Sequence, residues 1–316
     1  MMKDFLAHSS ALLGIDIGTR GIKLLELAGN ANACTVKSFA RVAYETGWPD
    51  NKAAAETLIS TSLQKAIRQS GTLTRNAALA IPFSESITRS ISLPAGLAPD
   101  ELLARVELEA DQQLPYSLDE LYWDFTRQDK QDASVDRVEI VLVASRRDYV
   151  EDRIALAEQS GLRVKVLDIE TCAMENAVIA YNTRMNQVYQ SHAVLMIDES
   201  ITRFSLIHDD GTTQAHELRD ITADCHETLA HEIRQILSSR DKTRPGTWPD
   251  IIQLGGEITG LDSIATHLQT LLDIPSVVID PLAGMDKAPP GRLSPGPDAS
   301  PAFLLACGLA LRAFDP

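Results

Sequence analysis

The chain carries one unusual pattern twice: an apolar strand, a tight turn and a second strand of alternating polarity. Residues 12–27 read LLGIDIGTRGIKLLEL, in which Gly-Thr-Arg-Gly separates two strand-forming runs. Residues 192–208 read HAVLMIDESITRFSLIH and repeat the same order. Both segments predict a β-hairpin. Because the pattern recurs at a distance, this weak internal repeat favours a duplicated, two-lobed fold.

Strands and helices alternate around the first hairpin. Residues 52–69 place apolar side chains on one helical stripe, and Gly71 follows as a favourable C-terminal cap. Strands are expected at 36–44 and 76–81. This order predicts a mixed α/β architecture.

Residues 86–167 read as a compact block of their own. Their pattern predicts strand, helix, two strands, helix and strand, which is the βαββαβ order of a ferredoxin-like unit. We therefore expect an inserted subdomain that interrupts a first lobe formed by 10–85 and 168–190. The second lobe is expected at 191–301, and the apolar helix of 302–316 returns to the first lobe.

Composition excludes several classes of protein. Hydrophobic residues make up 44% and charged residues 23% of the chain, as in ordinary globular proteins. The 29 Lys and Arg against 44 Asp and Glu give a formal charge of −15. Nucleic-acid affinity comes largely from basic side chains that neutralise phosphates, so no nucleic-acid partner is expected.

Membrane insertion, export and a zinc centre are not expected either. No window reaches the roughly 18 apolar residues of a membrane span. Residues 1–11 lack the apolar core of a signal peptide. The four cysteines lie far apart without a C-x-x-C pair, which predicts thiols in a reducing cytoplasm.

The first hairpin has the residues of a phosphate loop. Glycines such as Gly14 and Gly18 let the backbone approach a phosphate, and the Thr19 hydroxyl can donate a hydrogen bond. The Asp16 carboxylate can hold a hydrated Mg²⁺. The alternative is a tight turn whose glycine serves backbone conformation alone.

The whole pattern resembles the actin-like nucleotide-binding superfamily: two hairpins, an inserted unit, a strand followed by Gly255-Gly256, and a buried terminal helix. Within it, the chain resembles the PilM family of type IV pilus assembly proteins, which is related to the division protein FtsA. The resemblance rests on GIDIGTRGIKLLEL (14–27), on ISLP and the following acidic helix (101–121), on LVASRRDYVEDRIALAEQSGLRVKVLDIE (142–170) and on the segment 254–282.

The resemblance implies a nucleotide, ATP with Mg²⁺, between the lobes. Asp16, Gly18 and Thr19 would form the first phosphate loop, with Asp16 holding the metal through water. Lys23 would approach phosphate or be an exposed strand lysine. The remaining implied contacts, near the adenosine, are Gly255 and Gly256.

The second hairpin departs from the family pattern, because Met196-Ile197-Asp198 stands where relatives carry Asp-Ile-Gly. Methionine cannot hold a hydrated metal ion, and an aspartate adds negative charge where phosphate should approach. Repulsion at about 4 Å is on the order of 1 to 4 kcal/mol. We therefore expect weak or lost ATP hydrolysis. The alternative is that Asp198 only caps a structural turn.

The resemblance also implies a partner, the cytoplasmic tail of the inner-membrane protein PilN, in a groove between the first lobe and the inserted subdomain. An acidic surface attracts the Lys- and Arg-rich tails of such proteins. The candidate acidic residues, on a predicted helix, are Glu101, Glu107, Glu109 and Asp111. The alternative is an ordinary solvated helix face.

We therefore expect a cytoplasmic scaffold, peripheral to the inner membrane, that joins pilus membrane proteins to cytoplasmic motor ATPases. It is expected to be a binding protein and not an enzyme. Self-association is left open. The alternative is an active ATPase or small-molecule kinase of the same fold.

Overall fold

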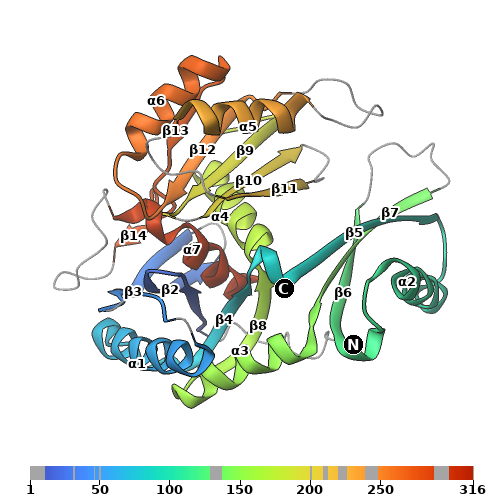
Figure 1. Cartoon of the computed structure of the whole chain (residues 1–316), viewed down its shortest axis with the longest axis horizontal. Helices are drawn as coiled ribbons and strands as arrows, with labels where there is room; N and C mark the ends of the chain where they lie inside the picture. The colour runs from blue at the N-terminus through green and yellow to red at the C-terminus, as the bar shows by residue number, and fades with distance from the viewer. Residues whose placement is uncertain are drawn as a thin grey trace.

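The computed structural model describes residues 11–30, 33–45, 47–49, 51–128, 137–199, 201–208, 213–219, 226–238, 248–287 and 299–315. It has two large sheets, one above the other in Figure 1, and a smaller sheet to their right. None of the described helices combines the length and hydropathy that a membrane crossing requires.

The first sheet has the strand order β14-β3-β2-β1-β4-β8. Its strands are β1 (Leu13–Ile17), β2 (Gly21–Asn30), β3 (Ala33–Ala43), β4 (Asn76–Ile81), β8 (Arg163–Ile169) and β14 (Asp286–Lys287). The predicted hairpin is confirmed, since β1 pairs antiparallel with β2, and β4 then pairs parallel with β1. β14 pairs parallel with β3 at the edge of the sheet, and residues 288–298, which follow it, lie outside the described residues.

Helices cover both faces of this sheet. α1 (Lys52–Ser70) and α3 (Arg147–Gln159) bury apolar residues against one face. Asn51 caps the start of α1, where its side chain accepts the N–H of Ala54, and Gly71 caps the end in the left-handed conformation. α4 (Glu170–Arg184) and α7 (Leu304–Leu311) pack on the other face.

The second sheet repeats the first. Its order is β11-β10-β9-β12-β13, formed by β9 (Ser191–Ile197), β10 (Ile201–His208), β11 (Thr213–Arg219), β12 (Ile251–Gly256) and β13 (Ser276–Val278). β9 pairs antiparallel with β10 and parallel with β12, as β1 does with β2 and β4. The predicted internal repeat is therefore a real duplication of topology.

The second sheet is covered on its outer face by α5 (His226–Ser238) and α6 (Leu261–Leu272). Its inner face packs on the cluster that holds α4 and α7, so these two helices lie between the sheets. They touch through backbone, since a Cβ on Gly308 would lie 1.7 Å from the carbonyl oxygen of Ala173. No residue larger than glycine fits at this crossing without moving a helix.

The smaller sheet forms the inserted part of the molecule. It contains β5 (Ser86–Pro94), β6 (Leu121–Gln128) and β7 (Arg137–Arg146) in the order β5-β7-β6, and α2 (Pro99–Gln113) covers one face. Figure 1 shows this unit projecting to the right. The short helix η2 (Phe83–Glu85) leads into it from β4.

The inserted unit differs from the predicted βαββαβ in one respect. The elements follow that order along the chain, but the last strand, β8, pairs with β4 in the first sheet, and α3 packs beside α1. The separate sheet therefore has three strands, and its chain returns to the first lobe at the end of β7. The residue limits of the lobes remain predictions.

Candidate functional site between the lobes

Two hairpin ribbons, β1–β2 and β9–β10, have the same local structure. Asp16 faces Lys23 in the first ribbon, and Met196 faces Arg203 in the second. The turns are closed alike, by the N–H of Gly18 to the Gly21 carbonyl and by the N–H of Asp198 to the Ile201 carbonyl, both at 3.0 Å. Met196 therefore stands in the place of Asp16, and Asp198 in the place of Gly18.

The tips of the two ribbons meet where the lobes face each other. Arg20 in the turn of the first ribbon forms an ion pair with Glu199 in the turn of the second. The neighbouring Thr19 and Gly18 lie at the same tip, with Thr19 exposed. The ribbons thus face each other from opposite lobes.

Lys23 is the centre of the first ribbon's charges. Its side chain is 3% exposed, so the reading of an exposed strand lysine is wrong. Nζ lies 3.0 Å from Asp16 Oδ2 and 2.8 Å from Glu257 Oε2, and Glu257 belongs to the second lobe. Burial opposes the positive charge, but Asp16 and Glu257 outweigh it and raise the pKa of Lys23.

Glu257 serves two cations of the first lobe. While one carboxylate oxygen meets Lys23, the other accepts hydrogen bonds from Arg41 Nε at 2.8 Å and Nη2 at 2.6 Å. Burial alone would raise the pKa of Glu257; Lys23 and Arg41 together lower it. The carboxylate is therefore ionised and fully paired at neutral pH.

Arg203 is the counterpart of Lys23 in the second ribbon. Its Nε lies 2.8 Å from Glu170 Oε2, at the start of α4, and its Nη1 lies 3.3 Å from Asp198 Oδ2. Glu170 also accepts the N–H of Phe83 at 3.1 Å, which ties it to the end of β4 in the first lobe. Both lobes thus contribute one cation that pairs with a carboxylate of the other.

Met196 and Asp198 have separate structural roles. Met196 is 2% exposed and packs in the apolar cluster around α4 and α7. Asp198 Oδ1 accepts the N–H of Glu257 at 3.3 Å, beyond the end of β12. Burial raises the pKa of Asp198, against the opposing effects of Lys23 and Arg203.

Gly255 and Gly256 are required by packing. A Cβ at Gly255 would lie 2.9 Å from Leu304 Cδ2. Gly256 has φ +127°, and a Cβ there would lie 2.1 Å from the Ile197 carbonyl oxygen. Close contact with β9 and with the start of α7 accounts for both glycines, and the prediction that they lie near an adenosine stays untested.

The resemblance to the actin-like superfamily implies a nucleotide between the lobes, so the residues present can be tested against one. At the first ribbon, Asp16 already pairs with Lys23. At the second, the Asp198 carboxylate stands in the place of Gly18 and, with the Ile197 carbonyl, accepts the backbone N–H of Glu257. Within the described ranges no cluster of three or more His, Cys, Asp or Glu side chains is placed to hold a metal ion. The second ribbon does not fit a metal-bound triphosphate.

The four acidic residues proposed for partner binding lie on α2, away from both lobes. Glu101, Glu107 and Asp111 are exposed, and Glu109 is half-buried. Two of them have local partners: Glu101 accepts the N–H of Ala98 at 3.4 Å, and Glu109 accepts from the Gln113 amide at 3.0 Å. α2 packs on the smaller sheet, and the role of its acidic residues in partner binding stays a prediction.

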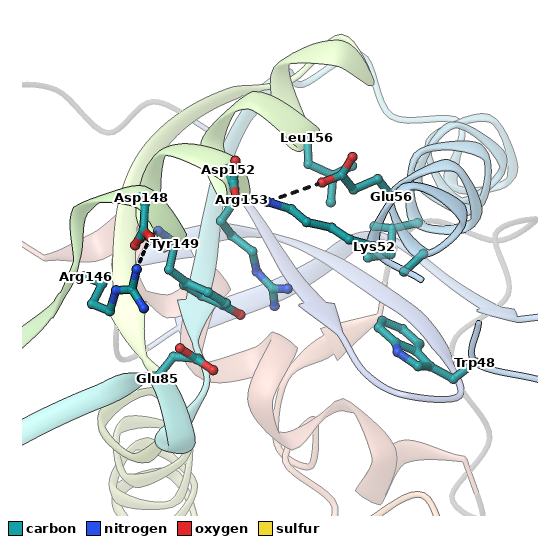
Figure 2. Close-up of a pocket in the computed structure, with 12 residues that line it drawn as sticks. Trp48, Lys52, Glu56, Glu85, Arg146, Asp148, Tyr149, Asp152, Arg153 and Leu156 are labelled. Carbon is teal, nitrogen blue, oxygen red and sulfur yellow. Dashed lines mark hydrogen bonds and ion pairs between the residues drawn. The ribbon is translucent and has the colours of Figure 1, made fainter. Parts of the chain in front are cut away.

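A pocket of about 400 Å³ lies instead at the root of the inserted unit, between α1 and α3 (Figure 2). Apolar side chains form part of its wall: Trp48, Ala55, Ile59, Tyr149 and Leu156. Charged side chains form the rest: Lys52, Glu56, Glu85, Arg146, Asp148, Asp152 and Arg153. None of these residues is a candidate of the sequence analysis, because they come from segments that meet only in the folded chain.

The charges of the pocket are unevenly paired. Lys52 pairs with Asp152, and Arg146 with Asp148. Within the described part of the chain, the Glu85 carboxylate and the Arg153 guanidinium have no ion-pair partner, and Arg153 Nε is buried without a hydrogen bond. In Figure 2, Glu85 and Arg153 lie on either side of the Tyr149 ring. The pocket can therefore accept both a cation and a hydrogen-bond acceptor.

Comparison with known proteins identifies relatives of this chain. The family model of the type IV pilus assembly protein PilM matches residues 14–219, more than half of the chain. A solved PilM-PilN type IV pilus biogenesis complex is similar over 98% of this chain and 100% of that chain, with a TM-score of 0.81 and 21% identity.

Two further solved structures show the same fold at greater distance. One is the cytoplasmic domain of EpsL, an inner membrane component of the type II secretion system of Vibrio cholerae, with a TM-score of 0.50, 13% identity and coverage of 96% of this chain and 95% of that chain. The other is the ethanolamine utilization protein EutJ from Carboxydothermus hydrogenoformans, with a TM-score of 0.50, 13% identity and coverage of 98% and 91%. The predicted two-lobed actin-like α/β fold is confirmed.

Proposed function

This chain belongs to the PilM family of type IV pilus assembly proteins, and from that premise we propose that it is a scaffold of the inner-membrane pilus assembly complex. It binds the cytoplasmic N-terminal tail of PilN at the cytoplasmic face of the membrane. The complex named in the matched structure, PilM with PilN, supports this partner. Cytoplasmic motor ATPases are proposed as further partners. Self-association is a separate question, which measurement of the molecular mass in solution answers.

The observation that carries the docking site is the pocket between α1 and α3. It opens where η2 enters the inserted unit and where β7 leaves it, which is the junction of that unit with the first lobe. Trp48, which is 48% exposed, and Tyr149 offer apolar surface for an aliphatic side chain. Glu85 offers a carboxylate for a Lys or Arg of the tail, and Arg153 a donor for a backbone carbonyl.

The same chemistry favours a membrane-protein tail as the occupant. Cytoplasmic segments next to a membrane span are enriched in Lys and Arg. The chain has a formal charge of −15, so it attracts such a segment over a distance before the pocket is reached. The acidic residues of α2 contribute to this field without contacting the tail.

In this role the protein is a binding protein in which ATP hydrolysis is weak or lost. Support comes from the second ribbon, where buried Met196 replaces a metal-binding acid and Asp198 places a carboxylate at the phosphate side. An active ATPase or small-molecule kinase would need that ribbon for metal and phosphate. No geometric feature of the described residues favours the enzyme over the scaffold.

A binding measurement tests the docking site. A fluorescent peptide of the N-terminal cytoplasmic residues of PilN from the same cell is titrated with the full chain, and anisotropy is recorded at low and high salt. Glu85→Lys is expected to weaken binding at least tenfold, since it places a like charge against the tail; tenfold corresponds to about 1.4 kcal/mol. Higher salt is expected to weaken wild-type binding.

Glu107→Lys on α2 is the matched control, because it makes the same charge change outside the pocket. It is expected to leave binding within about twofold. The reverse result, with the α2 variant weak and the pocket variant normal, would move the docking site to α2. Absence of binding at low salt by the wild-type chain would refute the scaffold proposal.

A further inference from the structure

Several ion pairs join the two lobes, and the central ones are largely buried. First-lobe Lys23 and Arg41 share the Glu257 carboxylate of the second lobe. Second-lobe Arg203 pairs with Glu170, which follows β8 of the first sheet. At the mouth of the cleft, Arg20 pairs with Glu199. Every one of these contacts joins the two lobes.

The two central pairs are placed by the duplicated fold. Lys23 and Arg203 occupy corresponding positions of their ribbons, each opposite the residue two before the turn. Lys23 is 3% exposed, and the side chains of Arg203 and Glu170 are 11% and 9% exposed. Each ribbon therefore sends one buried cation to a carboxylate of the opposite lobe.

The carboxylates also occupy the hydrogen-bonding groups that a phosphate would need. Asp198 Oδ1 accepts the N–H of Glu257, and Asp16 Oδ2 faces Lys23 Nζ. A triphosphate brings several negative charges and requires cations or N–H donors at these places. Here the described cations of the cleft already face carboxylates of the chain itself.

We propose that internal ion pairs close this chain's interlobe cleft without nucleotide, the carboxylates of Asp198, Glu170 and Glu257 standing where phosphates would otherwise bind. This interlobe latch is defined by Lys23, Arg41, Arg203, Glu170, Asp198 and Glu257. It goes beyond the scaffold function, because it concerns the cleft and not the α1–α3 pocket. The protein then presents one fixed surface to its partners whatever the cellular nucleotide level.

Removal of one partner from a buried pair leaves the other charge uncompensated, so truncation of the cations should open the cleft. The test compares the wild-type full chain with the double variant Lys23→Met/Arg203→Met. Denaturation of each purified protein and analysis of the released small molecules first show that it is nucleotide-free. Small-angle X-ray scattering measures the overall dimensions. The wild-type curve is expected to match the closed structure and to stay unchanged on addition of ATP with Mg²⁺, and the double variant is expected to have a larger radius of gyration.

Amide hydrogen exchange supplies a local readout. The N–H of Phe83 donates to the Glu170 side chain of the latch, whereas the N–H of Glu257 donates both to Asp198 Oδ1 and to the Ile197 carbonyl within the second lobe. In the double variant the Phe83 amide is expected to exchange at least about tenfold faster, while Leu79 in the fully buried part of β4 keeps its wild-type rate. Lys65→Met is the matched control, since it removes an ion pair with Glu45 inside the first lobe.

Three outcomes would overturn the latch. They are an expanded wild-type chain in the absence of nucleotide, compaction of the wild-type chain by ATP with Mg²⁺, and a double variant with wild-type dimensions and exchange rates. If the double variant does not fold, Glu257→Gln takes its place with the same expected direction. Peptide binding is scored separately, so failure of the latch and failure of the scaffold proposal are distinguishable.

Discussion

A buried carboxylate outside the cleft, Glu26 in β2, allows a quantitative prediction about the first lobe. Glu26 is 1% exposed. Oε1 accepts from Lys37 Nζ and Thr74 Oγ1, both at 2.7 Å, and Oε2 accepts from Ser38 Oγ at 2.9 Å and Thr72 Oγ1 at 2.6 Å. This one side chain therefore fastens β3 and the loop before β4 to the centre of the sheet.

The substitution Glu26→Gln keeps the shape and removes the charge. The Gln carbonyl can still accept two of the four hydrogen bonds, and the other two donors then face an amide NH₂. Hydrogen bonds to charged groups contribute about 1.5–3 kcal/mol each. Because hydroxyl groups can rotate to accept from the amide, we take the lower end and expect a loss of about 3 kcal/mol in the free energy of unfolding.

The loss should depend on pH with a definite sign. Burial alone would raise the pKa of Glu26, but hydrogen bonds from Lys37, Thr72, Thr74 and Ser38 outweigh it and lower the pKa. A carboxyl group whose folded pKa is depressed stabilises the fold above its unfolded pKa of about 4.3, and this contribution is lost as pH falls through the folded value. The difference between wild type and Glu26→Gln should therefore be constant from pH 8 to about pH 5 and shrink below about pH 4.

Urea unfolding followed by circular dichroism measures the free energy at each pH. Glu45→Gln is the control, because Glu45 is an exposed carboxylate paired with Lys65, and no measurable change is expected. The reasoning is refuted if Glu26→Gln is as stable as this control at pH 7. A difference that grows as pH falls would contradict the sign of the pKa shift.

Two further predictions concern the cleft and the helix crossing. Addition of ATP with Mg²⁺ should leave the thermal unfolding midpoint of the wild type unchanged. The variant Met196→Asp/Asp198→Gly rebuilds the family pattern of the second ribbon, so its unfolding midpoint should rise when nucleotide is added. A large rise in the wild type would contradict this prediction. Gly308→Val should destabilise the fold by about 3 kcal/mol or more, since even a Cβ would lie 1.7 Å from the Ala173 carbonyl oxygen. The control is Ala313→Val, at a half-buried position nearby, which should change the unfolding midpoint far less.

Local pattern was sufficient to predict most elements of the fold. The ribbons at 12–27 and 192–208 were visible because alternation and turn residues act over a few residues. The helix over 52–69 was visible because Gly71 ends a clear apolar stripe. Strand β8 was assigned to the wrong sheet, because the choice of a parallel partner depends on tertiary packing and leaves no local signal.

The site was harder to predict, because its partners are distant in sequence. Lys23 is buried only through Glu257, which belongs to the other lobe. Arg203 was missed, although it follows Met196 by the same seven positions that separate Lys23 from Asp16 (203 − 196 = 23 − 16). Superposition of the two ribbons would have indicated it. The α1–α3 pocket has no comparable signal, since Trp48, Glu85 and Arg153 come from three separate segments.

The contact of α4 with α7 determines how this molecule can move. At Gly308 the two helix backbones touch with no side chain between them, so they cannot slide apart or approach further without losing that fit. Rotation about the crossing is then the motion that preserves most contacts. A small rotation there would separate the lobes where side chains alone join them, as Arg20 and Glu199 do.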